Sequence, residues 1–252
     1  MPDKFANVEI LYRLMGGLAA LELPIVFKGA VVLRTVLENA GIVETARQTR
    51  DIDGDWVGEP PSMENLLLHI SKVADGLDIQ GIKVAVVREY AENRSAGFRV
   101  SVGAETLFTI DISIRPNPFG REYYTVTGVR FIGSSIEKIV ADKVKTISSR
   151  LVFRRTKDIY DLYLLSALNV HELHAIAEVY HAQNVAIGEF TEFITDVSLV
   201  EHAYEQLAFI SSKPTFETVY TRVSFFLQPF IDKSYTDVSA TWSSEACRWI
   251  CK

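Results

Sequence analysis

Two aspartates, Asp51 and Asp53, stand two residues apart in the stretch 49–53, which the sequence predicts to be a strand. Alternate residues of a strand point to the same face, so both carboxylates face one way and Ile52 faces the other. Such a pair suits a hard divalent cation, Mg²⁺ or Mn²⁺, which prefers oxygen ligands and keeps positions open for substrate phosphates. The alternative interpretation is a solvated strand end.

A glycine that begins a helix lies upstream, in the sequence Lys28-Gly29-Ala30. We expect a short apolar strand at 25–27 before it and a helix at 30–39 after it. Such a turn exposes backbone N–H groups at the positive end of the helix dipole, where phosphate can bind, although many such turns bind nothing. A phosphate-binding turn followed by paired carboxylates is the order typical of a nucleotidyltransferase.

Asp111 is the third carboxylate of interest. It lies on the polar face of the expected strand 108–115, whose other face is formed by Phe108, Ile110, Ile112 and Ile114. If this strand lies beside 49–53, Asp111 joins the same cluster, and three carboxylates could hold two metal ions for an in-line displacement. The alternative is a solvated residue on a polar strand face.

A lysine interrupts the apolar stripe of the helix that we expect to begin at Ser134, where Ser134 and Glu137 have capping-box spacing. The stripe consists of Ile136, Ile139, Val140, Val144, Ile147 and Leu151. Lys143 falls inside it and Lys145 falls outside. A buried ammonium needs an anion, so we expect Lys143 to reach the acidic cluster or a bound triphosphate. Snorkelling to the surface is the alternative.

Asp158 and Asp161 share a face of the next expected helix with several leucines. Carboxylates on an apolar face need a cationic partner, and we expect one for Asp161. Asp158 could instead complement the dipole at the start of the helix. Acids together with one buried cation suffice for nucleotidyl transfer, which depends mostly on positioning and charge neutralisation.

Composition indicates a protein with an ample core and no membrane span. The chain has 252 residues, 48% of them hydrophobic, and a net charge of −6. Its apolar runs are shorter than the roughly 18 residues of a spanning helix, and its N-terminus does not resemble a signal peptide. We interpret Cys247 and Cys251 as incidental thiols of a cytoplasmic protein.

The stretch 137–157 carries seven basic residues against two acidic ones, although the protein as a whole is acidic. A local basic strip suits a nucleotide or a short stretch of RNA better than a long duplex. The alternative is a solvated helix face.

The remaining pattern predicts an α/β half and a helical half, with a boundary near Gly133. We expect a first helix at 5–21 that is interrupted at Gly16-Gly17, and a helix capped by Ser62. Strands are expected at 82–88, 98–102, 108–115 and 123–131, and only helices from Ser134 onward. His171, His174 and His181 are interpreted as surface or capping residues of one helix.

Five segments together resemble the AbiEii/AbiGii toxin family of nucleotidyltransferases, which belongs to the polymerase-β-like superfamily. They are KGAVVLR (28–34), TRDID (49–53), TIDIS (109–113), EKIVADKVKTISSR (137–150) and KDIYDLYLL (157–165). The resemblance implies an α+β fold, with a mixed sheet and flanking helices as the nucleotidyltransferase core in 1–133. It also implies a C-terminal helical bundle, in 134–252, packed on the core.

The resemblance also assigns roles to individual residues. Catalytic roles fall to Asp51, Asp53, Asp111, Lys143 and Asp161, and the three acids Asp51, Asp53 and Asp111 are the metal ligands. Nucleotide phosphates would be bound by Lys28, Gly29, Ala30, Lys143 and Asp158. Two departures affect substrate choice. Ala30 stands where the family usually has glycine or serine, so no hydroxyl contacts phosphate there, and Lys157 stands where arginine is common.

The sequence therefore predicts a nucleotidyltransferase that depends on Mg²⁺ or Mn²⁺ and moves a nucleoside monophosphate from an NTP to an acceptor, which we expect to be RNA. The resemblance implies the toxin of a toxin–antitoxin or abortive-infection system, with an antitoxin protein as partner. Two alternatives stay open: a catalytically inactive nucleotide-binding or interaction protein of the same fold, and a nucleotidyltransferase that modifies a small molecule such as an antibiotic.

Overall fold

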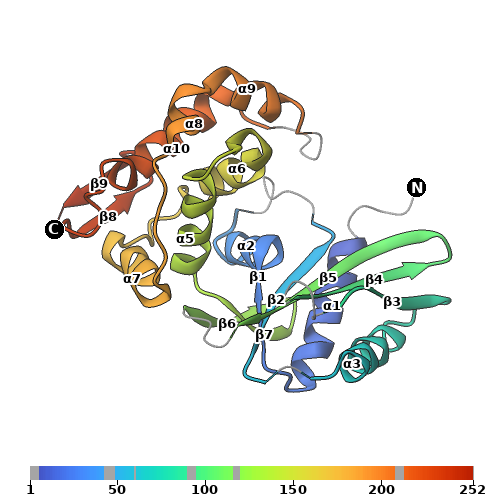
Figure 1. Ribbon diagram of the computed structural model, residues 1–252. Coiled ribbons are helices and arrows are strands. Elements are labelled where there is room, and N and C mark those ends of the chain that lie inside the picture. Colours follow the sequence, from blue (N-terminus) through green and yellow to red (C-terminus); the bar gives the residue numbers. More distant parts are fainter. Residues whose placement is uncertain are drawn as a thin grey trace. The chain divides into compact units, whose positions relative to one another are not determined.

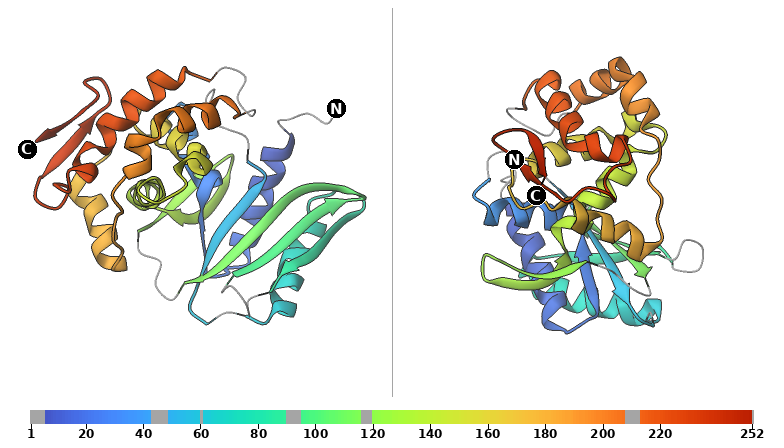
Figure 2. Two further views of the ribbon diagram at one scale, coloured as in Figure 1. Left: turned by 45° about the horizontal axis from the view of Figure 1, so that its top comes forward. Right: turned by 90° about the vertical axis from the view of Figure 1, so that its left-hand side faces the viewer.

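The computed structural model describes residues 6–42, 49–59, 61–89, 95–115, 120–207 and 213–251. The chain divides into two compact units, Met1–Asn39 with Gln48–Ser134, and Ala40–Arg47 with Ser135–Lys252. The first unit holds a large sheet with helices, and the second is mainly helical (Figure 1; Figure 2). This is the α+β class that the sequence predicts.

The sheet of the first unit has seven strands in the order β3-β4-β5-β2-β1-β7-β6. The strands are β1 (Ile25–Lys28), β2 (Asp51–Val57), β3 (Ile82–Arg88), β4 (Ser95–Val102), β5 (Glu105–Arg115), β6 (Arg121–Val126) and β7 (Val129–Ser134). The pairs β2–β5 and β1–β7 are parallel, and the other pairs are antiparallel. The sheet is therefore mixed, as expected, and β5 lies directly beside β2.

Strand alternation separates an apolar face of this sheet from a polar one. Ile52 of β2 pairs with Ile110 of β5, and both are fully buried. The neighbouring positions on each strand point the opposite way and include the aspartates. Burying the even-numbered side chains of β2 and β5 therefore forces Asp53 and Asp111 onto one common face.

Three helices accompany the sheet: α1 (Ala6–Ala20), α2 (Gly29–Asn39) and α3 (Met63–Asp75). Helix α1 contacts β7 and α3, and α3 contacts β3. The Ser62 hydroxyl accepts a hydrogen bond from the Asn65 backbone N–H, so the expected cap of α3 is confirmed. Gly41 follows the end of α2 with a φ of +76°, a left-handed conformation that favours glycine.

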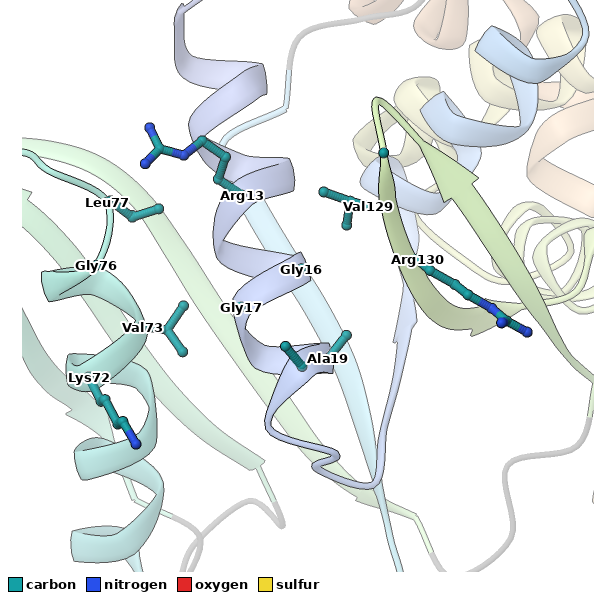
Figure 3. Close-up of a pocket in the computed structure, with 12 residues that line it drawn as sticks. Arg13, Gly16, Gly17, Ala19, Lys72, Val73, Gly76, Leu77, Val129 and Arg130 are labelled. Carbon is teal, nitrogen blue, oxygen red and sulfur yellow. The ribbon is translucent and has the colours of Figure 1, made fainter.

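The expected interruption of the first helix at Gly16-Gly17 is wrong, because α1 is continuous. The two glycines instead allow close packing on both sides of the helix. A Cβ atom at Gly16 would lie 2.8 Å from Cγ1 of Val129, and one at Gly17 would overlap Val73 of α3. Figure 3 shows α1 between these two valines.

The single strand expected at 123–131 is in fact a hairpin of β6 and β7. Its two-residue turn, Thr127-Gly128, has φ values of +48° and +79°. Positive φ at both positions is the requirement of a type I′ turn, which suits the twist of a hairpin. Threonine is a poor residue for this conformation, which is why the sequence pattern did not indicate a turn.

The second unit contains the remaining elements. They are α5 (Ile136–Ile147), the 3₁₀ helix η1 (Val152–Arg155), α6 (Thr156–Leu165), α7 (Leu173–Gln183), α8 (Thr191–Thr195), α9 (Val197–Glu205), α10 (Phe216–Ile231), β8 (Ala240–Ser243) and β9 (Arg248–Cys251). The expectation of helices alone after Ser134 is thus wrong, because β8 and β9 form an antiparallel hairpin. Trp242 and Trp249 hold this hairpin against Phe226 of α10, with ring centroids 4.9 and 5.2 Å away. Cys247 and Cys251 are free thiols within the described part of the chain.

Helix α5 begins one residue later than the capping pattern predicted. Its N-cap is Ser135, whose hydroxyl accepts a hydrogen bond of 3.3 Å from the Lys138 N–H, and not Ser134. The apolar stripe ends at Ile147, because Leu151 lies beyond the helix in a left-handed conformation and is 45% exposed.

His171 is not a surface residue, contrary to expectation. Its side chain is 1% exposed, lies before α7 and packs edge-on against Phe226. The Nε2 atom lies 2.7 Å from the Leu165 carbonyl oxygen. Burial lowers the pKa of His171 below the ordinary value of 6.5, so the ring is held neutral.

Candidate functional site

Five residues stand side by side across five strands of the first unit. Strand register aligns Arg88 of β3 with Gly97 of β4, Gly97 with Asp111 of β5, Asp111 with Asp53 of β2, and Asp53 with Lys28 of β1. Register partners point to the same face of a sheet. This line, here called the carboxylate row, therefore places two carboxylates next to each other with one cation at each end.

Asp51 lies on the same face of β2, two residues before Asp53 of the carboxylate row. Its register partner is Thr109, whose hydroxyl donates a hydrogen bond of 2.6 Å to Asp51 Oδ1. This contact orients an otherwise exposed carboxylate. The structure thus brings Asp51, Asp53 and Asp111 onto one face of neighbouring strands, as the alternation of β5 suggested.

Asp55 continues the alternation of Asp51 and Asp53 and is buried. The Lys28 ammonium forms an ion pair with it. Lys28, expected to bind phosphate, therefore already has a carboxylate partner in the first unit. Asp55 is not among the residues predicted from the sequence, although it is a third aspartate at the same spacing as Asp51 and Asp53.

Gly29 is the first residue of α2 and contacts the Asp53 side chain. Its φ is +71°, and a Cβ atom there would overlap the Asp53 carboxylate. Only glycine fits both the backbone conformation and the space. Asp53 therefore lies beside the start of α2, the end at which a helix leaves backbone N–H groups without partners inside the helix.

The carboxylate of Asp111 is bound by the Arg88 guanidinium, a partner that the sequence reasoning did not find. Within the described ranges, no three His, Cys, Asp or Glu side chains are grouped as a metal site would require. Asp51 and Asp53 by themselves still suit Mg²⁺, because this ion is commonly held by one or two carboxylates, with water and substrate phosphates completing its shell. The donor set therefore fits a cation held by two aspartates, with Asp111 engaged elsewhere.

Lys143 is buried in the second unit with two carboxylates around it. Its Nζ atom lies 2.6 Å from Asp161 Oδ2 and 3.1 Å from Asp158 Oδ1. Lys143 is 7% exposed and Asp161 0%, so the lysine does not snorkel to the surface. Burial by itself would lower the pKa of Lys143, but the charges of Asp161 and Asp158 raise it, which keeps the ammonium protonated. Asp161 has no exposed surface and forms its ion pair with the ammonium of Lys143.

The basic strip is exposed apart from two of its lysines. Lys143 is buried, and Lys138 forms an ion pair with Asp142 on α5. The exposed members are Lys145, Arg150, Arg154, Arg155 and Lys157. Glu192 of α8 accepts hydrogen bonds from the backbone N–H groups of Leu151 and Val152, which fixes the start of η1.

A cavity of about 600 Å³ lies elsewhere in the first unit, beside α1, α3 and the turn between β6 and β7 (Figure 3). Its charged lining consists of Arg13, Lys72 and Arg130. The residues predicted from the sequence to form the site are not among those that line it, so it is separate from the carboxylate row.

A comparison with protein families agrees with the family that the sequence resembles. A family model described as "Nucleotidyl transferase AbiEii toxin, Type IV TA system" matches residues 10–233. A comparison with curated proteins gives no match.

Three solved structures align with this chain. JHP933 from Helicobacter pylori aligns with a TM-score of 0.58 and 16% identity, over 92% of this chain and 94% of that chain. The MenT4 nucleotidyltransferase toxin from Mycobacterium tuberculosis aligns with a TM-score of 0.45 and 15% identity, over 93% of each chain. A Megavirus polyadenylate synthase aligns with a TM-score of 0.43 and 13% identity, over 64% of this chain and 30% of that chain.

Proposed function

Because the chain belongs to the AbiEii family of nucleotidyltransferase toxins, we propose that it transfers a nucleoside monophosphate from an NTP to an RNA acceptor, with the help of Mg²⁺ or Mn²⁺. The protein is a nucleotidyltransferase, and its fold is the α+β fold with a mixed sheet that the sequence predicts. The cation, the acceptor and the roles of single residues are the parts that we propose.

The carboxylate row carries the proposal. Asp51 and Asp53 would hold the cation, which supplies charge neutralisation and alignment for the triphosphate when it is bound. Thr109 orients Asp51 through its hydroxyl, and Gly29 lets the start of α2 approach the Asp53 side chain closely. The first turn of α2 would bind the phosphates, because the positive end of a helix dipole attracts anions.

In the reaction, the oxygen of the acceptor hydroxyl bonds to the α-phosphorus and its proton passes to solvent, while the bond between the α-phosphorus and the leaving pyrophosphate breaks. Negative charge accumulates on the phosphates, and fixed cations stabilise it. We assign Lys143 to this role, as the resemblance implies. Asp161 is then a positioning residue, which holds the buried ammonium at 2.6 Å, while the more exposed Asp158 holds it at 3.1 Å.

RNA is the acceptor that the exposed basic residues of the second unit favour over a neutral small molecule. Five exposed lysines and arginines lie within the stretch 145–157. Cations in such a cluster contact backbone phosphates and release counterions when RNA binds. The degenerate alternative, an inactive nucleotide-binding protein, is disfavoured because all the expected acids are present.

An antitoxin protein is the further partner that we propose, since the family is described as part of a Type IV toxin–antitoxin system. No helix in the described part of the chain is long and apolar enough to cross a membrane. The cytoplasmic location expected from the sequence stays a prediction.

The proposal is tested by incubating the protein with each labelled NTP and total RNA, with and without magnesium. We expect the wild-type protein to label RNA only when Mg²⁺ is present. The double variant Asp51→Asn/Asp53→Asn should fold and transfer nothing, whereas Asp75→Asn, which changes an exposed aspartate of α3, should transfer normally. Wild-type rates in the double variant would refute the assigned site. Labelling of an antibiotic in place of RNA would favour the small-molecule alternative.

A further inference from the structure

A β-bulge in β3 determines which side chain faces the carboxylate row. Val86 pairs with Phe98 of β4, and the next register pair is Arg88 with Gly97, so Val87 is the extra residue. Without this shift, Val87 would stand opposite Gly97 and Arg88 would turn away. Bulges are known to re-aim a side chain at the edge of a sheet. Here the bulge turns a guanidinium toward the aspartates.

Gly97 leaves the space that the arginine needs to cross β4. A Cβ atom at Gly97 would lie 3.3 Å from the Arg88 Cβ and 3.4 Å from Asp111 Oδ1. The same Cβ would lie 3.1 Å from Val87 Cγ2, so a side chain at this position would crowd both strands that flank β4. The bulge and the glycine act together, and their joint result is the ion pair of Arg88 with Asp111.

The contact between Arg88 and Asp111 uses only part of the guanidinium. The Nη2 atom donates to Asp111, whereas the Nε atom is buried without a hydrogen-bond partner among the described residues. A buried N–H without a partner is costly, and the two side chains are 40% and 39% exposed, so water screens their attraction. The pair is therefore weakly held, which suits a partner that can be exchanged.

We propose that Arg88 is a positioning residue that competes with a divalent cation for Asp111. The guanidinium occupies Asp111 in this structure, so Asp51 and Asp53 alone would hold the first cation. Asp111 becomes a ligand only after Arg88 releases it. Arg88 thereby raises the cation concentration that is needed to fill the site. This inference rests on the proposed cation site of the previous subsection.

Binding of Mn²⁺ to the full-length protein without nucleotide tests the inference, measured by electron paramagnetic resonance. Arg88→Met frees Asp111 and should tighten Mn²⁺ binding by about fivefold, the range of a half-exposed ion pair. The gain should disappear when Arg88→Met is combined with Asp111→Asn. The control Lys83→Met removes an exposed charge from the same strand and should change the affinity by less than about twofold. Arg88→Lys keeps a cation and should remain close to wild type.

A second variant decides the matter even if Arg88→Met does not fold. Asp111→Asn alone should weaken Mn²⁺ binding by less than about threefold, because the carboxylate is already occupied. A loss greater than about tenfold would show that Asp111 is a primary ligand and would overturn the inference. An unchanged affinity in a folded Arg88→Met variant would overturn it as well.

Failure of the proposed cation site gives a different result. If the wild-type protein binds no Mn²⁺, or if Asp51→Asn/Asp53→Asn binds it normally, both the site and the inference are refuted. If Mn²⁺ binding needs Asp51 and Asp53 but ignores Arg88, only the inference about Arg88 is refuted.

Discussion

Replacing Gly29 by alanine is the sharpest perturbation of the carboxylate row, because helix α2 provides its own control. Gly29 and Gly41 lie at opposite ends of this helix, with φ values of +71° and +76°. A Cβ atom at Gly29 overlaps Asp53, whereas one at Gly41 has nothing within 4 Å among the described residues. Both substitutions therefore place alanine in a left-handed backbone conformation, but only Gly29→Ala also creates a steric overlap with Asp53.

The expected costs follow from this difference. Alanine in a left-handed conformation costs about 1–2 kcal/mol, which is the whole loss expected for Gly41→Ala. Gly29→Ala carries the same strain and must also push aside the Asp53 carboxylate, which adds about 1–3 kcal/mol, as overpacking usually does. We therefore expect losses of about 1–2 kcal/mol for Gly41→Ala and about 2–5 kcal/mol for Gly29→Ala.

Urea denaturation and RNA labelling together measure the two effects. Gly41→Ala should label RNA at nearly the wild-type rate. Gly29→Ala should lose more than about tenfold, since a displaced Asp53 needs to weaken transition-state stabilisation by only about 1.4 kcal/mol for such a loss. Equal losses of stability and rate in the two variants would refute the reasoning, because they would mean that the contact between Gly29 and Asp53 has no effect.

Three further predictions concern the second unit. Lys143→Met leaves the buried Asp161 without its cation and should lower the free energy of unfolding by about 3–5 kcal/mol. The exposed control Lys145→Met should change it by less than about 0.5 kcal/mol, and equal values in urea denaturation would contradict the buried pair. Arg154→Glu with Arg155→Glu should reduce RNA labelling and flatten its salt dependence but leave NTP affinity unchanged, and unchanged labelling at two salt concentrations would exclude RNA as the acceptor bound there. Burial lowers the pKa of His171, so the unfolded chain takes up a proton that the folded protein does not, and the free energy of unfolding should fall as the pH drops below 6.5. An equal free energy of unfolding at pH 7.5 and pH 5 would show that His171 takes up no extra proton on unfolding.

The grouping of Asp53 and Asp111 could be predicted because two simple regularities agree. Side chains alternate along each strand, and an apolar face must be buried, so the polar positions of β2 and β5 had to share a face once the strands were neighbours. Similarly, Lys143 stood out because a charge within an apolar stripe requires a partner.

Features that break a period could not be predicted in this way. Arg88 reaches Asp111 through a bulge, and reading β3 with a strict period of two would have placed Val87 on that face. The turn at Thr127-Gly128 lacks the Asn or Asp that usually marks a type I′ turn. The strands of β8 and β9 are only four residues long, too short for alternation to be distinguished from a helical pattern.

The tryptophans give the two units separate optical signals. Trp56 is buried in β2, directly after the buried Asp55. Trp242 and Trp249 belong to the hairpin on α10, where their indole N–H groups donate to carbonyl oxygens of Ser166 and Phe226. In a Trp56→Phe protein, fluorescence emission would therefore report unfolding of the second unit alone. Any difference from the wild-type emission curve would then report how far the first unit unfolds independently.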